Sequence, residues 1–194
     1  MTTLSVAAVL GAVTYVGVMR LGGIAWDYTS DRPMKIENVE LAPAQMTELN
    51  SRIAAFQEAV TSDAPARLVL TANEINAELS SRNDLKEIGI KGHIGIEGDK
   101  ITAAMTMPCP IQTFGLKDRY INGNATIRIL LQAGRLRIYV DSIEANGRLL
   151  PETFMTRLRN TNLAEKAMKD PKTAAAIAKL RGITIQNGAV VIEK

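Results

Sequence analysis

Few side chains in this 194-residue sequence have the type and the setting that catalysis requires. His93 is the only histidine, and no motif marks a nucleophile that it could activate as the base of a triad. Cys109, the only cysteine, lies between two prolines with no adjacent cationic residue to activate its thiol. Only Glu74 and Glu78 have the spacing of two metal ligands on one helical face, and a helix cap already explains Glu74. The sequence therefore predicts a protein that is not an enzyme and has no metal site.

Glycines recur at every third position, at Gly89, Gly92, Gly95 and Gly98. The run matches neither the P-loop pattern nor the dinucleotide-binding fingerprint, so we expect no nucleotide and no other cofactor. A glycine inside a strand marks a bulge, or the close approach of a ligand or another backbone. Gly89, Gly92 and Gly95 are therefore candidates for a close approach, with curvature of the sheet as the alternative.

Five basic side chains share polar positions of predicted strands: Lys91, His93, Arg128, Arg135 and Arg137. If these strands pair as neighbours, the five side chains face one side of the sheet. Such a face would suit anionic lipid headgroups. The alternative is ordinary solvated charge, which open faces and edges of sheets commonly carry.

The overall charge argues against a nucleic-acid-binding protein. Lys and Arg number 23 against 20 Asp and Glu, which leaves a net charge of +3. Nucleic-acid binding needs a concentrated basic face that displaces counterions. Aromatic residues make up only 4% of the chain, so stacking platforms for bases are not expected either.

Four strands are predicted in the middle of the chain, because apolar and polar residues alternate there with a period of two. They cover residues 88–97, 101–107, 125–131 and 136–140. Turns are predicted at Gly98-Asp99 and at Ala133-Gly134, and Pro108 ends the second strand. The two hairpins predict a twisted antiparallel meander with one apolar face.

Helical patterns precede this meander. An apolar stripe with helical spacing predicts a helix from Pro43 to about residue 60, with the proline in its first turn. A short strand candidate at residues 67–70 follows. Thr71 and Glu74 then have the spacing of a capping box, which predicts the start of a second helix.

The end of the chain returns to helix and closes with a hairpin. One helix is predicted to begin at Pro151, and another has Asp170 as its N-cap and Gly182 just past its end. Asn187-Gly188 is the turn of the closing hairpin. Because the helices must cover the apolar face of the sheet, the predicted fold class is α+β.

Residues 4–26 are almost entirely apolar and predict a membrane anchor. As a helix they would span about 35 Å, enough for a hydrocarbon core of about 30 Å. Arg20 is the only charge, and it must snorkel or end the apolar stretch. A cleaved signal peptide and a buried soluble helix remain as alternatives. The positive-inside rule would place Arg20, Arg32 and Lys35 in the cytoplasm, which conflicts with the export inferred below.

These patterns divide the chain into three parts. We predict a membrane anchor helix at residues 1–26, a juxtamembrane linker at 27–41 and a single α+β domain at 42–194. The expected architecture is a twisted antiparallel β-meander packed by helices on one face, preceded by one N-terminal transmembrane helix.

Several short motifs give the domain a resemblance to known proteins. They are LTANEIN at residues 70–76, RYING at 119–123, GRL at 134–136, NGRLLPETFM at 146–155, RNTNLA at 159–164 and NGAVVI at 187–192. Together they resemble uncharacterised bacterial envelope proteins with one N-terminal membrane helix, and more remotely the YpmS-like family. The resemblance implies a single-pass protein of the bacterial cytoplasmic (inner) membrane with an extracytoplasmic domain. It brings no established catalytic residues.

The sequence thus predicts a membrane-anchored, non-enzymatic envelope domain that binds a lipid or a partner protein, with membrane contact through residues 4–26. The alternative is a small structural subunit that scaffolds a larger membrane protein complex, because Ala7 and Gly11 would allow close helix packing. A continuous apolar groove beside the sheet would favour lipid binding, and a filled core would favour scaffolding.

Overall fold

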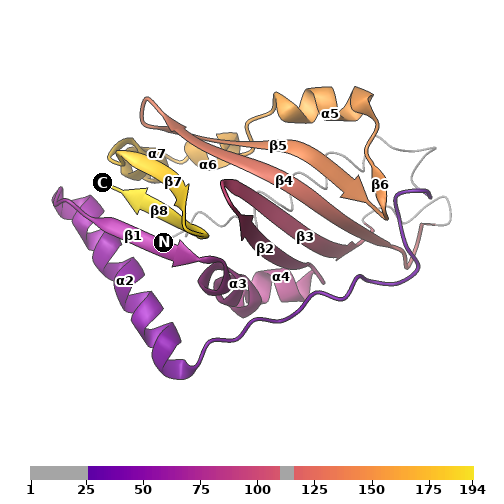
Figure 1. The fold of residues 1–194 in the computed structure, drawn as a ribbon, viewed down its shortest axis with the longest axis horizontal. Helices are drawn as coiled ribbons and strands as arrows, with labels where there is room; N and C mark the ends of the chain where they lie inside the picture. Colours follow the sequence, from indigo (N-terminus) through magenta and orange to yellow (C-terminus); the bar gives the residue numbers. More distant parts are fainter. Residues whose placement is uncertain (1–25, 110–115) are drawn as a thin grey trace.

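The computed structural model describes residues 26–109 and 116–194, which form an α+β fold with two antiparallel sheets (Figure 1). The predicted fold class is confirmed at this level. The predicted N-terminal transmembrane helix lies outside the described residues, apart from Trp26 at its end. Among the residues that the structure describes, no helix is long and apolar enough to cross a membrane.

The larger sheet is the predicted meander, with strands in the order β2-β3-β4-β5-β6. The strands are β2 (Lys91–Glu97), β3 (Lys100–Pro108), β4 (Tyr120–Gln132), β5 (Arg135–Ala145) and β6 (Arg148–Leu149). The prediction that β2 starts at Ile88 was wrong. Ile88 ends a short helix, and Gly89 has a positive φ of 72°, so the extended strand begins only at Lys91.

Two-residue turns with positive φ at both positions join several strands of the two sheets. They lie at Ala133-Gly134, Asn146-Gly147 and Asn187-Gly188. This is the geometry of type I′ turns, whose twist matches the right-handed twist of paired strands. The turns therefore fix the register of their hairpins, and the first and third of them were predicted as turns.

A second, three-stranded sheet joins distant parts of the chain in the order β1-β8-β7. Its strands are β1 (Arg67–Thr71), β7 (Gly182–Gln186) and β8 (Ala189–Glu193). The closing hairpin of β7 and β8 was predicted, but its pairing with β1 was not. Thr71 lies opposite Ala189, and no local pattern specifies a partner 118 positions away.

The helices of the described residues are α2 (Pro43–Ser62), α3 (Ala72–Ser81), α4 (Asn83–Glu87), α5 (Glu152–Arg159), α6 (Glu165–Met168) and α7 (Pro171–Ala178). Two predicted starts are confirmed, because Thr71 and Glu74 form a capping box and Asp170 caps α7. Gly182, expected just past the last helix, instead begins β7 because α7 already ends at Ala178.

One face of the five-stranded sheet forms the core. Apolar side chains at alternate positions of β2 to β5 pack against α3, α6, α7 and the β7–β8 hairpin. The sheet contributes Ile94, Ile101, Ala103, Met105, Met107, Ile121, Ile127, Leu136 and Ile138, and the covering elements contribute Ile75, Leu79, Ala164, Ile177 and Val190. Val140 adds a second cluster with Met155 and Leu158 of α5. Helices α3, α5, α6 and α7 and the β7–β8 hairpin therefore lie on one face of the meander; the prediction placed helices there but did not include a second sheet.

Two asparagines protect the edges of this sheet. Beside edge strand β2, the Oδ1 of Asn76 accepts from the amide of Ile94 at 2.6 Å, and its Nδ2 donates to the Ile94 carbonyl at 2.8 Å. Beside β5, Asn162 accepts from the amide of Ile138 at 2.9 Å and donates to the carbonyl of Leu136 at 3.2 Å. Each side-chain amide replaces a missing neighbouring strand, so these backbone groups have partners.

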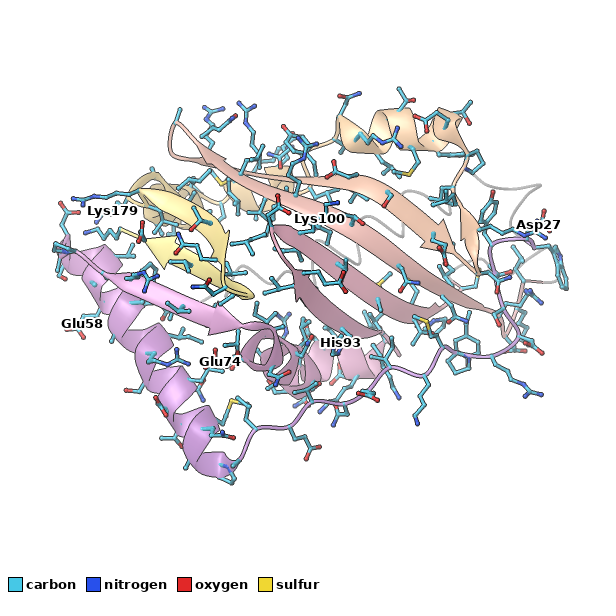
Figure 2. The ribbon with its side chains drawn as sticks, viewed as in Figure 1. Asp27, Glu58, Glu74, His93, Lys100 and Lys179 are labelled. Atoms are coloured by element: carbon cyan, nitrogen blue, oxygen red, sulfur yellow. The ribbon has the colours of Figure 1, made fainter. Side chains whose placement is uncertain are left out.

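The outer edge of β1 is closed by an ion pair from α2 and α3. Arg52 donates to the carbonyl of Val69 at 2.9 Å and pairs with Glu74, which lies between the two helices (Figure 2). Glu74 also accepts from the amide and hydroxyl of Thr71, at 2.8 and 2.9 Å. Burial raises the pKa of Glu74, but these hydrogen bonds and the charge of Arg52 outweigh it, so the pKa lies below its ordinary value of 4.5.

The segment predicted as a linker, residues 27–41, is bonded to the sheet near its start. Ser30 exchanges two backbone hydrogen bonds of 2.8 Å with Tyr120. Asn122 accepts from the amide of Met34 at 2.8 Å and donates to the carbonyl of Arg32 at 2.8 Å. The beginning of this segment is therefore part of the domain rather than a free tether.

We expect Asn76→Ala to lower the free energy of unfolding by about 2–4 kcal/mol, because it leaves the amide and carbonyl of Ile94 without partners beside a 1%-exposed site. Urea denaturation measures this loss. Asn160→Ala, which removes one exposed hydrogen bond to Thr156, is the matched control and should change stability by less than about 0.5 kcal/mol. Equal effects of the two substitutions would contradict the role assigned to Asn76.

Glu74→Gln should lower the free energy of unfolding by about 1 kcal/mol at pH 7, because it weakens the capping box and the contact with Arg52. A carboxylate with a lowered pKa in the folded state stabilises above its ordinary pKa, and this contribution is lost as the pH falls through the folded value. The difference from the parent protein should therefore shrink below pH 4.5. Denaturation at several pH values tests this, with Glu78→Gln one turn later as the control.

Candidate functional site

The candidate site is the face of the five-stranded sheet that points away from the core, here named the open face. The register aligns its side chains in rows that cross the strands. One row is Gly95, Thr102, Thr126 and Ser142, and the next is His93, Ala104, Asn124 and Glu144. Asn124 is exposed and the other seven residues are half-buried. These two rows form the centre of the open face.

Short side chains dominate this centre. Among its eight residues, only Glu144 has a carboxylate and only His93 has a basic group. Longer charged side chains surround the two rows: Lys91, Glu97, Lys100, Arg128 and Arg137, all of them exposed. Charged residues are also depleted at the centre of protein–protein interfaces, which have a polar rim. The two rows lack the aromatic side chains that such interfaces favour.

The register places all five predicted basic residues on the open face, but in two separate groups. Lys91 aligns with Thr106 and then Asn122, whereas Arg137 lies opposite Leu130. Asn122 and Leu130 are eight positions apart along β4, which is about 26 Å at roughly 3.3 Å per residue. A single lipid headgroup therefore cannot contact both groups.

In the first group, the ring of His93 lies against α3 (Figure 2). Its Nε2 is 3.4 Å from the Nδ2 of Asn76. Its Nδ1 is buried and has no hydrogen-bond partner among the described residues. The ring therefore belongs to the contact between β2 and α3, and only Lys91 of this group is exposed to a ligand.

In the second group, Arg128 is already paired. Its Nη2 lies 2.8 Å from an oxygen of Asp141, and its guanidinium lies 5.6 Å from the centre of the Tyr139 ring. The hydrogen bond and the charge of Asp141 raise the pKa of Arg128. Arg135 and Arg137 are exposed, and neither has an ion-pair partner in the described part of the chain. They are the free cations of the hairpin tip.

The three candidate glycines have different surroundings. At Gly89, φ is +72° and a Cβ would lie 2.9 Å from the Cγ of Pro108. At Gly95, a Cβ would lie 2.5 Å from the hydroxyl of Thr102, so this threonine leans across the glycine on the open face. At Gly92, the nearest atom would be a carbonyl oxygen at 3.7 Å, an ordinary contact. At Gly89 and Gly95, the atoms that approach the glycine closely therefore belong to side chains of the protein itself, Pro108 and Thr102.

The residues considered for catalysis or metal binding do not converge. Cys109 is 2% exposed, and its amide donates to the carbonyl of Arg119 at 2.7 Å. Glu74 belongs to the cap of α3. Within residues 26–109 and 116–194, no group of three or more His, Cys, Asp and Glu side chains is placed to hold a metal ion. These residues therefore do not form a common site in the described part of the chain.

The sequence analysis did not predict the role of Asn122 on the open face. Its Oδ1 accepts from the hydroxyl of Thr106 at 2.7 Å, and the same side chain holds residues 32 to 34 over the corner of the open face. An asparagine at a polar strand position was the only available signal. That signal does not identify a partner almost 90 positions earlier in the chain.

No protein family, curated protein or solved structure matches the chain. The resemblance to bacterial envelope proteins therefore stays a prediction.

Gly89→Ala should lower the free energy of unfolding by about 1–3 kcal/mol, because alanine is strained at a positive φ and its Cβ would press on Pro108. Gly92→Ala is the matched control three residues away and should be close to neutral. Urea denaturation of both variants compares the two positions. Similar losses of unfolding free energy in the two variants would show that the contact with Pro108 and the positive φ of Gly89 do not determine the effect.

Proposed function

We propose that this protein is a membrane-anchored, non-enzymatic envelope domain that binds a partner protein on the open face. The observation that carries the proposal is the contrast between the two faces of the five-stranded sheet. One face is covered by helices and a second sheet, whereas the other has a half-buried centre of short side chains inside a charged rim. Residues 4–26 supply the proposed anchor.

The packing of the apolar face supports a protein partner over a lipid held inside the fold. Ala164 is 0% exposed and Ile177 is 4% exposed, and both belong to the same core cluster as sheet residues such as Ile127. Protein side chains therefore occupy space beside the sheet that an acyl chain would need. A lipid could then bind only on the outside of the domain. There the basic residues form two groups, around Lys91 and around Arg137, which are far apart.

The composition of the open face supports the same choice. A five-stranded sheet whose outer face met only water would tolerate long charged residues in its middle rows. The central row instead combines a glycine with two threonines and a serine, at Gly95, Thr102, Thr126 and Ser142. Short side chains allow another protein surface to approach closely, and their hydroxyl groups can bond to it.

The scaffolding alternative differs from this proposal in how long the partner protein stays bound to the open face, and not in where it binds. A scaffold subunit would keep its partner on the open face permanently, whereas a binding domain would exchange it. The filled core favours scaffolding over the binding of a lipid beside the sheet, but it does not distinguish a permanent protein partner from an exchanging one.

Photocrosslinking tests the proposal directly. A benzoylphenylalanine placed at Asn124, at the exposed centre of the open face, should give one protein adduct of defined mass when the full chain is expressed in its native membrane. The same group at Gln57, an exposed amide side chain on α2, should give none. Thr126→Lys should abolish the adduct at position 124 without lowering the melting temperature, because it puts a charge in the centre.

Three outcomes would count against the proposal. Adducts of equal yield at both positions would indicate random collision. A lipid adduct at position 124 would favour the lipid-binding version of the function. The absence of any adduct at position 124, with the chain present in the membrane, would leave the open face without a partner.

A further inference from the structure

The end of the domain at which residue 26 lies carries two of the three large hydrophobic side chains that are exposed in the described structure. Trp26 is 55% exposed and Leu149 is 69% exposed; the third, Ile88, lies at the C-terminal end of α4. Trp26 stacks on the guanidinium of Arg119, with 4.1 Å between the Cζ and the ring centre. We name Trp26, Asp27, Arg119, Arg148 and Leu149 the Trp26 end.

The chain is fixed to the sheet immediately after Trp26. The side chain of Asn146 donates to the carbonyls of Asp27 and Thr29, each at 3.2 Å. Arg119 donates to the hydroxyl of Thr29 at 2.7 Å and to its carbonyl at 2.5 Å. Thr29 is 1% exposed. Residues 27–29 are therefore held on the domain and do not act as a flexible tether between an anchor and the domain.

The same contacts fix Leu149 relative to the end of the apolar segment. Tyr28, 9% exposed, directs its hydroxyl to the carbonyl of Leu149 at 3.5 Å. Asp27 pairs with the neighbouring Arg148, with 3.3 Å between oxygen and nitrogen. Tyr28 is two residues beyond Trp26, which an extended chain spans in about 7 Å. Leu149 is thus held close to the place where residues 4–26 end.

From this geometry we infer that the Trp26 end rests on the surface of the lipid bilayer, with Trp26 and Leu149 in the interfacial region and Arg119 and Arg148 among the headgroups. The inference rests on the proposed membrane anchoring of residues 4–26. Tryptophan prefers the membrane interface, and arginine beside it can meet lipid phosphates. The domain would then have one fixed orientation on the bilayer instead of moving freely around a linker.

The chain is suited to a direct test because Trp26 is its only tryptophan. In a Trp26→Phe background, the full chain carries either Leu149→Trp or the control Glu58→Trp, which lies at the opposite end of the long axis from Asp27 (Figure 2). Both positions are exposed, so a tryptophan fits at each. Vesicles of phosphatidylcholine and phosphatidylglycerol are prepared with and without phosphatidylcholine brominated near the carbonyl end of its acyl chains, which quenches tryptophan on contact.

We expect the tryptophan introduced at position 149 to lose most of its emission in brominated vesicles and to shift to shorter wavelength. The tryptophan introduced at position 58 should keep its emission. Vesicle flotation, measured on the same samples, reports the anchoring separately.

The results distinguish failure of the inference from failure of the anchor. A chain that floats with the vesicles but is not quenched at position 149 stands away from the bilayer or uses this end for a protein partner, and the inference is overturned while the anchor stands. Equal quenching at both positions also overturns it, because no orientation is then fixed. A chain that does not float overturns the anchor and the inference together.

Discussion

Burial of one face of a five-stranded antiparallel sheet is the constraint on which the rest of this structure depends. The apolar residues that alternate along β2 to β5 would expose a broad hydrophobic surface if nothing covered them, and burial contributes about 25 cal/mol for each Å² of apolar surface removed from water. Helices α3, α5, α6 and α7 and the β7–β8 hairpin supply that cover. Because all of them are used on one side, the opposite face keeps the short polar residues that make it a candidate for binding.

A sheet of this kind has edges, and the second constraint is that buried backbone groups there need partners. Asn76 and Asn162 solve this problem in the same way on β2 and β5, with a side-chain amide that bonds as a neighbouring strand would. On β1, the carbonyl of Val69 bonds to Arg52. A stretch of edge strand that is closed in this way is not available to pair with another chain.

The contacts of residues 27–30 with the sheet relate the orientation of the sheet to the proposed membrane anchor. Ser30 pairs with Tyr120 at the start of β4, so the sheet begins almost where the apolar segment ends. If the segment is an anchor, the start of β4 and the end of β5 lie nearest the bilayer. The strands then lead away from the membrane, and the open face is presented to proteins beside it rather than to the lipid surface.

The sequence by itself determined the local features of this protein. Alternation defined the four central strands, the Thr71–Glu74 and Asp170 caps started two helices, and Ala133-Gly134 and Asn187-Gly188 marked two turns. These features need only neighbours within a few positions, so propensity and spacing suffice to predict them.

The tertiary structure alone decided which distant residues meet. Local spacing does not contain the pairing of β1 with β8, the bonds from Asn76 to Ile94, or the fixing of residues 27–34 to β4. It also separated the basic residues: alternation put Lys91 and Arg137 on the same face, but the register set them about 26 Å apart. An alternation with a period of two predicts which face of the sheet a side chain points to. A binding site depends in addition on the distances between side chains, and only packing and strand register fix these distances.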